Sequence, residues 1–477
     1  MKRKLWILIL LLVLPFMVFS SESSFESDFL VPFTSYPWEV STPEEQGIHS
    51  GVLAHACNEA EKMPFLHSLL VIRNQYLIGE RYFHFYDQND ANNVFSVSKS
   101  FLSALVGIAL RENYLQSLDQ KMLDFFPEYI TPGMDPRKFD ITIRHLLTMK
   151  TGYDNSVEDY GSNWRQWINS SDWLKYAIQL PLRDNPGERF AYITPGTHIL
   201  SGILAKATGM SALEFAETYL FHPLGISIMN WERDPQGYYI GGMRMYFTAR
   251  DMARFGYLYL NGGFVDNQQI IPGEWVTDSF TDSVHQNWTW AEVTEGGYGY
   301  LWWLYTINGI RTYCAVGYGG QYIILVPLLN MIVVTTSDGQ VNAQAASRQG
   351  ETIRQFIAHY ILAPTKAVLD APPYFPVSVT AKKVENRSLL QREYINVLSW
   401  QPNPNNSNVN ISRYRVYQVL TNQRLFLAEV DAGTFDYMER KVDEDRLYTY
   451  GITSVTDDNK ESLPIVVTVQ YTTSTSQ

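Results

Sequence analysis

The order of β-rich and helical segments constrains the fold of this chain more than any other feature of its sequence. β-rich runs at residues 68–73 and 76–83 come first, and helical patterns fill the middle. Further β-rich runs lie between residues 300 and 336, and a helical pattern at 348–361 closes the series. Strands at both ends with helices between them predict one mixed α+β domain, an α/β sandwich, over residues 40–362.

The composition changes after this region. Residues 363–376 carry four prolines, which predicts a stiff linker. Short β-type runs then recur to residue 472, a rhythm that predicts an all-β sandwich over 377–472. Trp400 after Val-Leu-Ser and Tyr448 before Thr-Tyr-Gly-Ile resemble the core tryptophan and the corner tyrosine of fibronectin type III domains. The resemblance implies a spacer, or a module that contacts a glycan or a cell surface, rather than a second enzyme.

The N-terminus has the pattern of a secretory signal peptide. Three basic residues, 2–4, precede a mostly apolar run at 5–19, and small polar residues follow. The apolar run is shorter than the roughly 20 residues that a membrane span needs. We therefore expect a signal peptide at 1–20, cleaved near Ser20, a lead-in at 21–39 and a secreted or periplasmic protein. An uncleaved anchor is the alternative, and the absence of a nearby cysteine argues against a lipoprotein.

Charge and cysteine content exclude several classes of function. The chain has a net charge of −12, so it would gain nothing by displacing the counterions of a nucleic acid, and we expect no nucleic-acid partner. Two cysteines, Cys57 and Cys314, exclude a disulfide-stapled miniprotein and leave one pairing open. The nine histidines show no close-spaced metal-ligand pair, and no phosphate-binding or zinc motif is present. No metal and no organic cofactor is expected, and the expected partner is a small-molecule substrate.

One S-x-x-K motif, Ser96-Val97-Ser98-Lys99, opens a helical pattern that runs from Val94 to Glu112. Residues three apart lie on one helix face, so the Lys99 amine can reach the Ser96 hydroxyl. A serine needs such a base, because its hydroxyl alone is a poor nucleophile. The alternative is structural: Ser96 as a helix N-cap and Lys99 as a solvated charge. The motif alone favours this structural alternative.

Further segments resemble the serine β-lactamase and penicillin-binding superfamily, in its order and spacing. They are Ile141–Met149 followed by Gly152, Pro186–Tyr192, Phe221–Ile226 and Gly317–Gln321. The match is to the class C branch, which includes esterases, D-aminopeptidases and 6-aminohexanoate-dimer hydrolases. It covers about residues 40–362 and implies a central antiparallel sheet with a helical region. Lys150-Thr151-Gly152 spells the family's K-T-G but precedes the tyrosine motif, so we expect Tyr318-Gly319-Gly320 to hold that place.

The resemblance implies a role for each matching residue. Ser96 would attack the acyl carbon, while Lys99 and Tyr192 would share its proton. Their ordinary pKa values of about 10.4 and 10 require a shift of about three units for activity near pH 7. Which of the two is the base stays open, because they titrate together. The backbone N–H groups of Ser96 and Gln321 would form the oxyanion hole.

Two departures from the family pattern bear on the substrate. Thr194 stands where the tyrosine motif often has Asn, and the third motif lacks both Lys and, at Gly319, a hydroxyl. A substrate carboxylate would lose a charge-assisted partner worth roughly 1.5–3 kcal/mol. The predicted substrate is therefore a small ester or an amide without that carboxylate. The expected substrate-binding residues are Thr194, Tyr318, Gly319, Gly320 and Tyr239, the last as a pocket wall.

Two other readings stay open. A cell-wall D-amino-acid peptidase or β-lactamase is the first, and a catalytically inactive surface binding protein is the second. Four tryptophans could line an acyl or sugar pocket, although core packing is the favoured role: Trp288, Trp290, Trp302 and Trp303.

Overall fold

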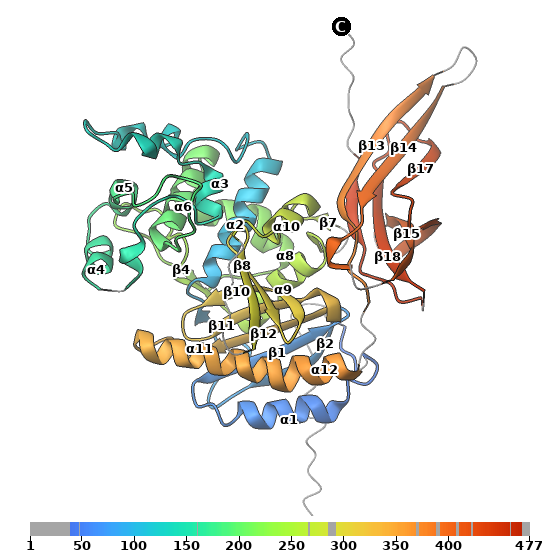
Figure 1. The fold of residues 1–477 in the computed structure, drawn as a ribbon, viewed down its shortest axis with the longest axis horizontal. Helices are drawn as coiled ribbons and strands as arrows, with labels where there is room; N and C mark the ends of the chain where they lie inside the picture. Colours follow the sequence, from blue (N-terminus) through green and yellow to red (C-terminus); the bar gives the residue numbers. More distant parts are fainter. Residues whose placement is uncertain are drawn as a thin grey trace, which may run out of the picture.

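The computed structural model describes residues 39–469, except 47, 160, 266–267, 285–291, 369–371, 388–391, 407–409, 421–422 and 458. The signal peptide predicted at 1–20 and nearly all of the lead-in predicted at 21–39 lie outside the described residues. Within the described part the chain forms a mixed helix and sheet domain followed by an all-β domain (Figure 1). The predicted fold class is therefore confirmed.

A seven-stranded antiparallel sheet is the centre of the first domain, in the order β2-β1-β12-β11-β10-β9-β8. Its strands are β1 (Leu66–Arg73), β2 (Tyr76–Tyr82), β8 (Val293–Tyr298), β9 (Trp303–Ile307), β10 (Ile310–Gly317), β11 (Gln321–Val326) and β12 (Met331–Ser337). The first strand of this domain pairs with its last, since β1 lies beside β12. The two-residue turn at Asn74 and Gln75, both at positive φ, joins β1 to β2.

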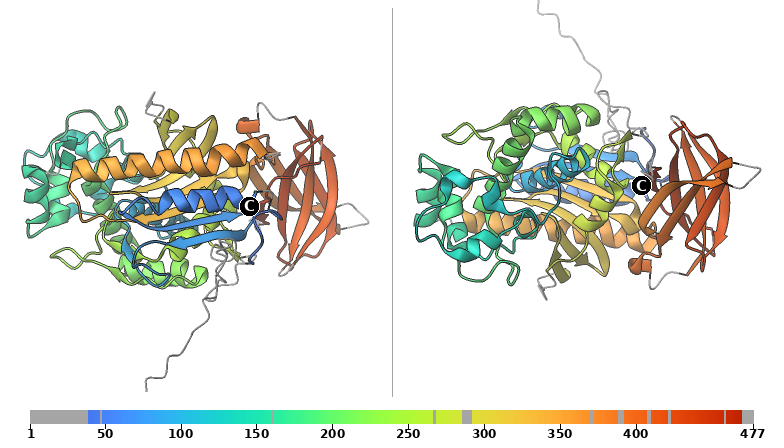
Figure 2. Two further views of the ribbon diagram at one scale, coloured as in Figure 1. Left: turned by 90° about the horizontal axis from the view of Figure 1, so that it is seen from below. Right: turned by 90° about the horizontal axis from the view of Figure 1, so that it is seen from above.

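Both faces of this sheet are covered. Successive residues of β12 point to opposite sides, so Ile332 and Val334 join one apolar core while Met331 and Val333 join the other. Helices α1 (Ser50–Ala60) and α11 (Ala343–Ile357) lie side by side on one face (Figure 2). Helices α2 (Val97–Arg111) and α9 (Ala249–Leu260) cover the other face. At Gly256 of α9 a Cβ would lie only 2.8 Å from Ile323 of β11, so this contact requires a glycine.

The middle of the chain builds a helical region beyond α2. Its helices are α3 (Ile143–Leu147), α4 (Ser162–Ile168), α5 (Trp173–Gln179), α6 (Thr194–Thr208), α7 (Ala212–Ala216), α8 (His222–Leu224) and α10 (Gly273–Ser279). Short 3₁₀ turns connect them: η1 (Met122–Asp124), η2 (Pro127–Tyr129), η3 (Pro136–Asp140), η4 (Asn155–Asp159) and, near the sheet, η6 (Pro327–Leu329). Small sheets are formed by β3 (Asn92–Asn93), β4 (Asn230–Trp231) and β5 (Met245–Phe247), and by β6 (Phe264–Val265) and β7 (Gln268–Gln269). Residues 119–130 have a helical sequence pattern, but they do not form a continuous helix: Pro127 divides the segment, which forms η1 and η2.

Two π-helical turns precede prolines. Turn η5 (Glu217–Phe221) leads into α8, which holds Pro223, and η7 (Ala358–Leu362) leads into α12 (Ala363–Val368), which holds Pro364. A wider turn relieves the clash of a proline ring with the preceding helical turn, so the helix can pass the proline. The segment at 363–376, predicted as linker, therefore begins as a continuation of the α11 helix.

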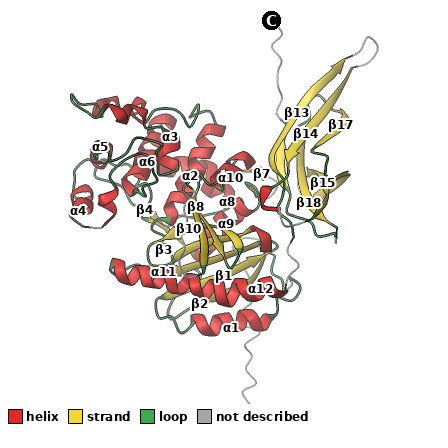
Figure 3. Ribbon diagram, viewed as in Figure 1, coloured by secondary structure: helices red, strands yellow, loops and turns green. Residues whose placement is uncertain are grey.

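The C-terminal domain consists of two packed sheets. Figure 3 shows this domain as strands, whereas the first domain has both helices and strands. One sheet contains β13 (Val377–Arg387), β14 (Arg392–Gln401) and β17 (Asp436–Val442). The other contains β16 (Gln423–Asp431), β15 (Ile411–Leu420), β18 (Thr449–Thr456) and β19 (Ile465–Thr468). The turn η8 (Pro404–Asn406) follows β14. Trp400 and Tyr414 are buried between them. The Tyr448 hydroxyl accepts a bond of 3.0 Å from the backbone N–H of Asp443 upstream, as a corner tyrosine does. The specific likeness to fibronectin type III stays a prediction.

Both cysteines are buried and free, so Cys57 and Cys314 do not pair. Burial raises the pKa of both thiols to about 12. Among the described residues no single helix has the length and apolar content to cross a membrane. One bent pair, Thr194–Thr208 with Ala212–Leu224, meets the criterion by length and composition alone.

Candidate active site

Ser96 stands at the start of α2 with its hydroxyl available for chemistry. It occupies the N-cap position, but its side chain makes no capping hydrogen bond. The preceding residue, Phe95, has a φ of +47°, a conformation that costs a bulky residue energy and that recurs at functional sites. The Phe95 backbone N–H is held by Asn93 at 3.0 Å. The structural alternative for Ser96, a simple helix cap, is therefore wrong.

Lys99 is one turn further along α2 and is buried, with 1% of its surface exposed. Its Nζ lies 3.0 Å from Ser96 Oγ, 2.9 Å from the Gly242 carbonyl oxygen and 3.1 Å from Thr194 Oγ1. Burial lowers the pKa of Lys99 to about 8, although the negative charge of Glu158 opposes this shift. A solvated lysine at this position is excluded, and the lowered pKa makes the neutral amine more accessible near neutral pH than it is for a free lysine.

Tyr192 approaches the lysine from the loop before α6. Its ring centroid lies 4.9 Å from Lys99 Nζ, so the structure brings all three predicted catalytic residues together. The ring stacks on Trp303 at 5.5 Å and meets Tyr298 edge to face at 6.3 Å. Phe190 packs against the same two rings, which gives this side of the site an aromatic wall.

Thr194 lies deeper inside the protein than is expected of a residue that contacts substrate. It is buried and begins α6. Its hydroxyl accepts from Lys99 and donates to Glu158 Oε2 at 3.1 Å, while its backbone N–H donates to Glu158 Oε1. Burial raises the pKa of Glu158, and the Lys99 charge and the two bonds from Thr194 oppose that rise. From the sequence Glu158 is expected only as part of a solvated face, because it stands in a turn without a motif, 36 residues before Thr194.

The loop before β5 supplies the third acceptor of Lys99. A Cβ at Gly241 would lie 2.1 Å from the Thr197 carbonyl oxygen, and one at Gly242 would lie 2.1 Å from Thr197 Oγ1. The two glycines therefore allow the loop to lie directly on α6. His198 Nδ1 accepts from the Gly241 N–H at 3.2 Å, and its Nε2 lies 3.0 Å from Asp234, so the loop is fixed from inside.

The turn between β10 and β11 closes the other side of the site. A Cβ at Gly317 would lie 2.4 Å from the Val94 carbonyl oxygen, so this turn touches the backbone that leads to Ser96. Gly319 and Gly320 have φ values of +84° and +111°, which explains why no hydroxyl-bearing residue stands there. The Gln321 side chain bonds to the Ser337 backbone at 2.7 and 3.1 Å, and this pairing fixes the start of β11.

Other predicted residues have different roles. The Tyr318 hydroxyl donates to the Val341 carbonyl oxygen, and its ring packs 5.4 Å from that of Phe95, beside the nucleophile. Tyr239 packs on Trp231 and accepts a bond of 2.6 Å from Arg233. These contacts hold the Tyr239 side chain against the segment that contains Trp231 and Arg233. Its role as a pocket wall stays a prediction. Trp302 is fully buried in the core as expected, whereas Trp288 and Trp290 lie outside the described residues.

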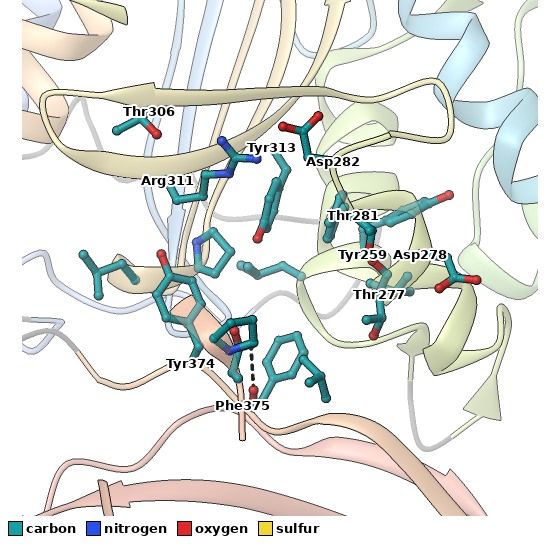
Figure 4. A pocket seen from close by; sticks show the side chains of 18 of the residues that line it. Tyr259, Thr277, Asp278, Thr281, Asp282, Thr306, Arg311, Tyr313, Tyr374 and Phe375 are labelled. Atoms are coloured by element: carbon teal, nitrogen blue, oxygen red, sulfur yellow. Dashed lines mark hydrogen bonds between the residues drawn. The ribbon is translucent and has the colours of Figure 1, made fainter. Parts of the chain in front are cut away.

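One cavity among the described residues lies away from Ser96. It measures about 840 Å³ and lies between the two domains, with Tyr313 and Arg311 from β10 on one side and Tyr374 and Phe375 on the other (Figure 4). None of Ser96, Lys99 or Tyr192 lines it.

Comparisons with known proteins agree with this fold. The family model described as Beta-lactamase matches residues 67–357. The 6-aminohexanoate-dimer hydrolase of Paenarthrobacter ureafaciens is 25% identical over 320 residues, which cover 62% of this chain and 79% of that protein. Two solved structures share the fold. EstCE1, a hydrolase with promiscuous acyltransferase activity, is 16% identical with a TM-score of 0.53 and covers 66% of this chain and 98% of its own. The octameric penicillin-binding protein homologue from Pyrococcus abyssi is 17% identical with a TM-score of 0.50 and covers 86% and 96%.

The site combines a buried lysine with a serine that begins a helix but does not cap it with its side chain. On this arrangement of sheet and helices, such a pair defines a serine hydrolase. The family match covers more than half of the chain, and the chain belongs to the beta-lactamase family. The predicted superfamily is thus confirmed.

Proposed function

We propose that the protein is an exported serine hydrolase that cleaves a small ester or amide through an acyl-enzyme on Ser96. One observation carries the proposal: the Nζ of a buried lysine lies 3.0 Å from a serine hydroxyl that is not used as a helix cap. Burying an amine lowers the free energy of unfolding. Three hydrogen bonds hold this amine in place, and one of them is with the nucleophile. Such an arrangement serves catalysis better than stability.

The reaction would proceed in two balanced steps. Ser96 Oγ attacks the acyl carbon and gives up its proton to Lys99, acting with Tyr192 as one coupled system. The same pair then protonates the departing alcohol or amine, which leaves an ester between Ser96 and the acyl group. Water repeats the sequence on that ester and releases the acid. We assign the oxyanion hole to the backbone N–H groups of Ser96 and Gln321, at the start of α2 and of β11.

The substrate we propose lacks a carboxylate next to the scissile bond. The turn at Tyr318-Gly319-Gly320 lacks the lysine and, at Gly319, the hydroxyl that hold such a group in the family pattern. The aromatic wall of Phe190, Tyr298 and Trp303 beside Tyr192 favours an apolar acyl or leaving group. The relative from Paenarthrobacter ureafaciens is named as a hydrolase of an amide dimer, which supports the amide option. For the C-terminal domain we keep the proposal of a spacer or a module for a glycan or cell surface.

The test is hydrolysis of p-nitrophenyl butyrate by the purified protein, with a chromogenic cephalosporin alongside. Turnover of the ester and little of the cephalosporin is expected. Ser96→Ala should abolish ester turnover, whereas Ser98→Ala should retain it, because the Ser98 hydroxyl finds no partner among the described residues. Fast cephalosporin hydrolysis would instead favour the β-lactamase or peptidase reading. Failure of both substrates, without a covalent adduct by mass spectrometry, would favour an inactive binding protein.

A further inference from the structure

The three neighbours of the Lys99 amine differ in what they can do. Its Nζ is surrounded by the Gly242 carbonyl at 2.9 Å, Thr194 Oγ1 at 3.1 Å and Ser96 Oγ at 3.0 Å. A neutral amine has two N–H bonds and one lone pair, and only the lone pair can take the Ser96 proton. The carbonyl can only accept, so it fixes one N–H. A threonine hydroxyl can donate or accept, so it fixes nothing by itself.

Glu158 removes that ambiguity. One carboxylate oxygen accepts from the Thr194 backbone N–H, and the other lies 3.1 Å from the Thr194 hydroxyl. A carboxylate accepts at both oxygens, so the hydroxyl proton of Thr194 points at Glu158. The lone pairs of Thr194 Oγ1 then face Lys99 and fix its second N–H. The one direction left for the lone pair of the amine is toward Ser96.

We propose that Glu158 is a positioning residue that acts through the Thr194 hydroxyl and directs the lone pair of neutral Lys99 at Ser96. This inference rests on the proposed acyl-enzyme at Ser96. It also explains the departure from the family pattern at Thr194. The asparagine common at that place carries a fixed carbonyl acceptor, whereas a rotatable hydroxyl needs a second residue to set its direction.

The first test replaces the hydroxyl and keeps the shape. Thr194→Val retains the backbone N–H bond to Glu158 but offers Lys99 no acceptor, and kcat/KM for p-nitrophenyl butyrate should fall by about 10²-fold. Thr194→Ser restores the hydroxyl and should return kcat/KM close to that of the wild type. A thermal melt of each variant checks the fold, and a rescue by Ser would not follow from a purely structural role.

The second test removes the carboxylate. Glu158→Gln offers an N–H₂ group where one acceptor is needed, so kcat/KM should fall by about the same 10²-fold. The double variant with Thr194→Val should be no worse than either single one, because both act on the same lone pair. Asp154→Asn is the matched control: this carboxylate lies on the same segment, accepts from the Ser156 N–H, and its change should leave kcat/KM unaltered.

The pH profile separates positioning from packing. The titratable groups that face Glu158 and Lys99 from other elements are Tyr192, before α6, and Tyr298, on β8. The Glu158 charge favours the protonated lysine. Glu158→Gln should therefore move the acidic limb of kcat/KM to lower pH by about one unit while its plateau falls.

The outcomes distinguish the inference from the proposed function. Full activity in both Thr194→Val and Glu158→Gln, with Ser96→Ala inactive, would overturn the inference and leave the acyl-enzyme intact. Additive losses in the double variant would also overturn it. Activity retained in Ser96→Ala would overturn the proposed function itself.

Discussion

Among the described residues, buried charged side chains occur in the first domain and not in the C-terminal domain. The C-terminal domain displays its ion pairs on strand surfaces, as where Arg413 and Arg415 of β15 both meet Glu429 of β16, which is 42% exposed. The first domain buries charged groups: Lys99, Glu80 and Arg250 are each at most 5% exposed. Because burying a charge costs far more than exposing one, the first domain must gain something from it. Stability and chemistry are the two candidate gains.

Two buried cations inside the first domain show the difference between those gains. Arg250 meets the Glu80 carboxylate through two bonds, of 2.6 and 2.9 Å. Lys99 meets two hydroxyls and a carbonyl, and its nearest carboxylate, Glu158, is separated from it by Thr194. A directly paired guanidinium stays charged and locks the fold. An amine without a direct ion pair can release its proton, and so it can act as a base. The comparison predicts that Lys99 contributes to rate and Arg250 to stability.

The largest expected effect is on rate. Lys99→Met removes the proton acceptor, and kcat/KM for p-nitrophenyl butyrate should fall by about 10⁴-fold. The midpoint of thermal unfolding should stay near that of the wild type, because the desolvation cost of the amine offsets its hydrogen bonds. A collapse of stability with activity preserved would reverse the roles assigned here.

Next comes the structural pair. Glu80→Gln leaves the Arg250 cation buried without its carboxylate and should lower the free energy of unfolding by about 3–5 kcal/mol. Well below the unfolding temperature, kcat/KM should be unchanged. Denaturant titration beside ester kinetics measures both. A fully folded variant that loses activity would contradict the assignment of Arg250 to stability and Lys99 to rate.

A third prediction concerns pH. The pKa of Lys99 is lowered by burial to about 8, and the base must be neutral to accept a proton. The sign follows: kcat/KM should rise with pH, about tenfold per unit below pH 8, and level off above it. The ester's spontaneous hydrolysis, measured with Ser96→Ala at each pH, is the control. A profile that is flat from pH 6 to 9 would exclude Lys99 as the titrating base.

The smallest effect belongs to the C-terminal domain. Glu429→Gln breaks the exposed pairs with Arg413 and Arg415 and should shift the thermal midpoint by no more than about 1 °C. Differential scanning calorimetry of the full chain would detect a larger change. A large destabilisation would show that this domain, too, depends on its charges.

The sequence predicted the part of the site that a motif marks. Ser96 and Lys99 lie in one motif and Tyr192 in another, and the resemblance of both segments to the family predicted that the three residues meet. It also predicted a mixed domain with β-type runs at both ends, and in the structure these runs pair as β1 and β12. Both successes depend on patterns that are local in the chain.

The missed features depend on contacts between distant segments. Glu158 stands in a 3₁₀ turn and reaches Thr194 only when α6 is folded beside it. A sequence hint existed, since a threonine in place of an amide lacks a fixed acceptor and calls for a neighbour. The extension of the helix past Pro364 was missed because the proline count argues for linker, whereas a π-helical turn accommodates the ring.

The most direct test of the central claim is covalent labelling with an alkyl fluorophosphonate, followed by peptide mass spectrometry across a range of pH. The account predicts one phosphonyl adduct, on Ser96, that forms faster as pH rises through about 8. In Lys99→Met the labelling rate should fall steeply at every pH. An adduct on another residue, or labelling of Ser96 at the same rate with and without Lys99, would contradict the account.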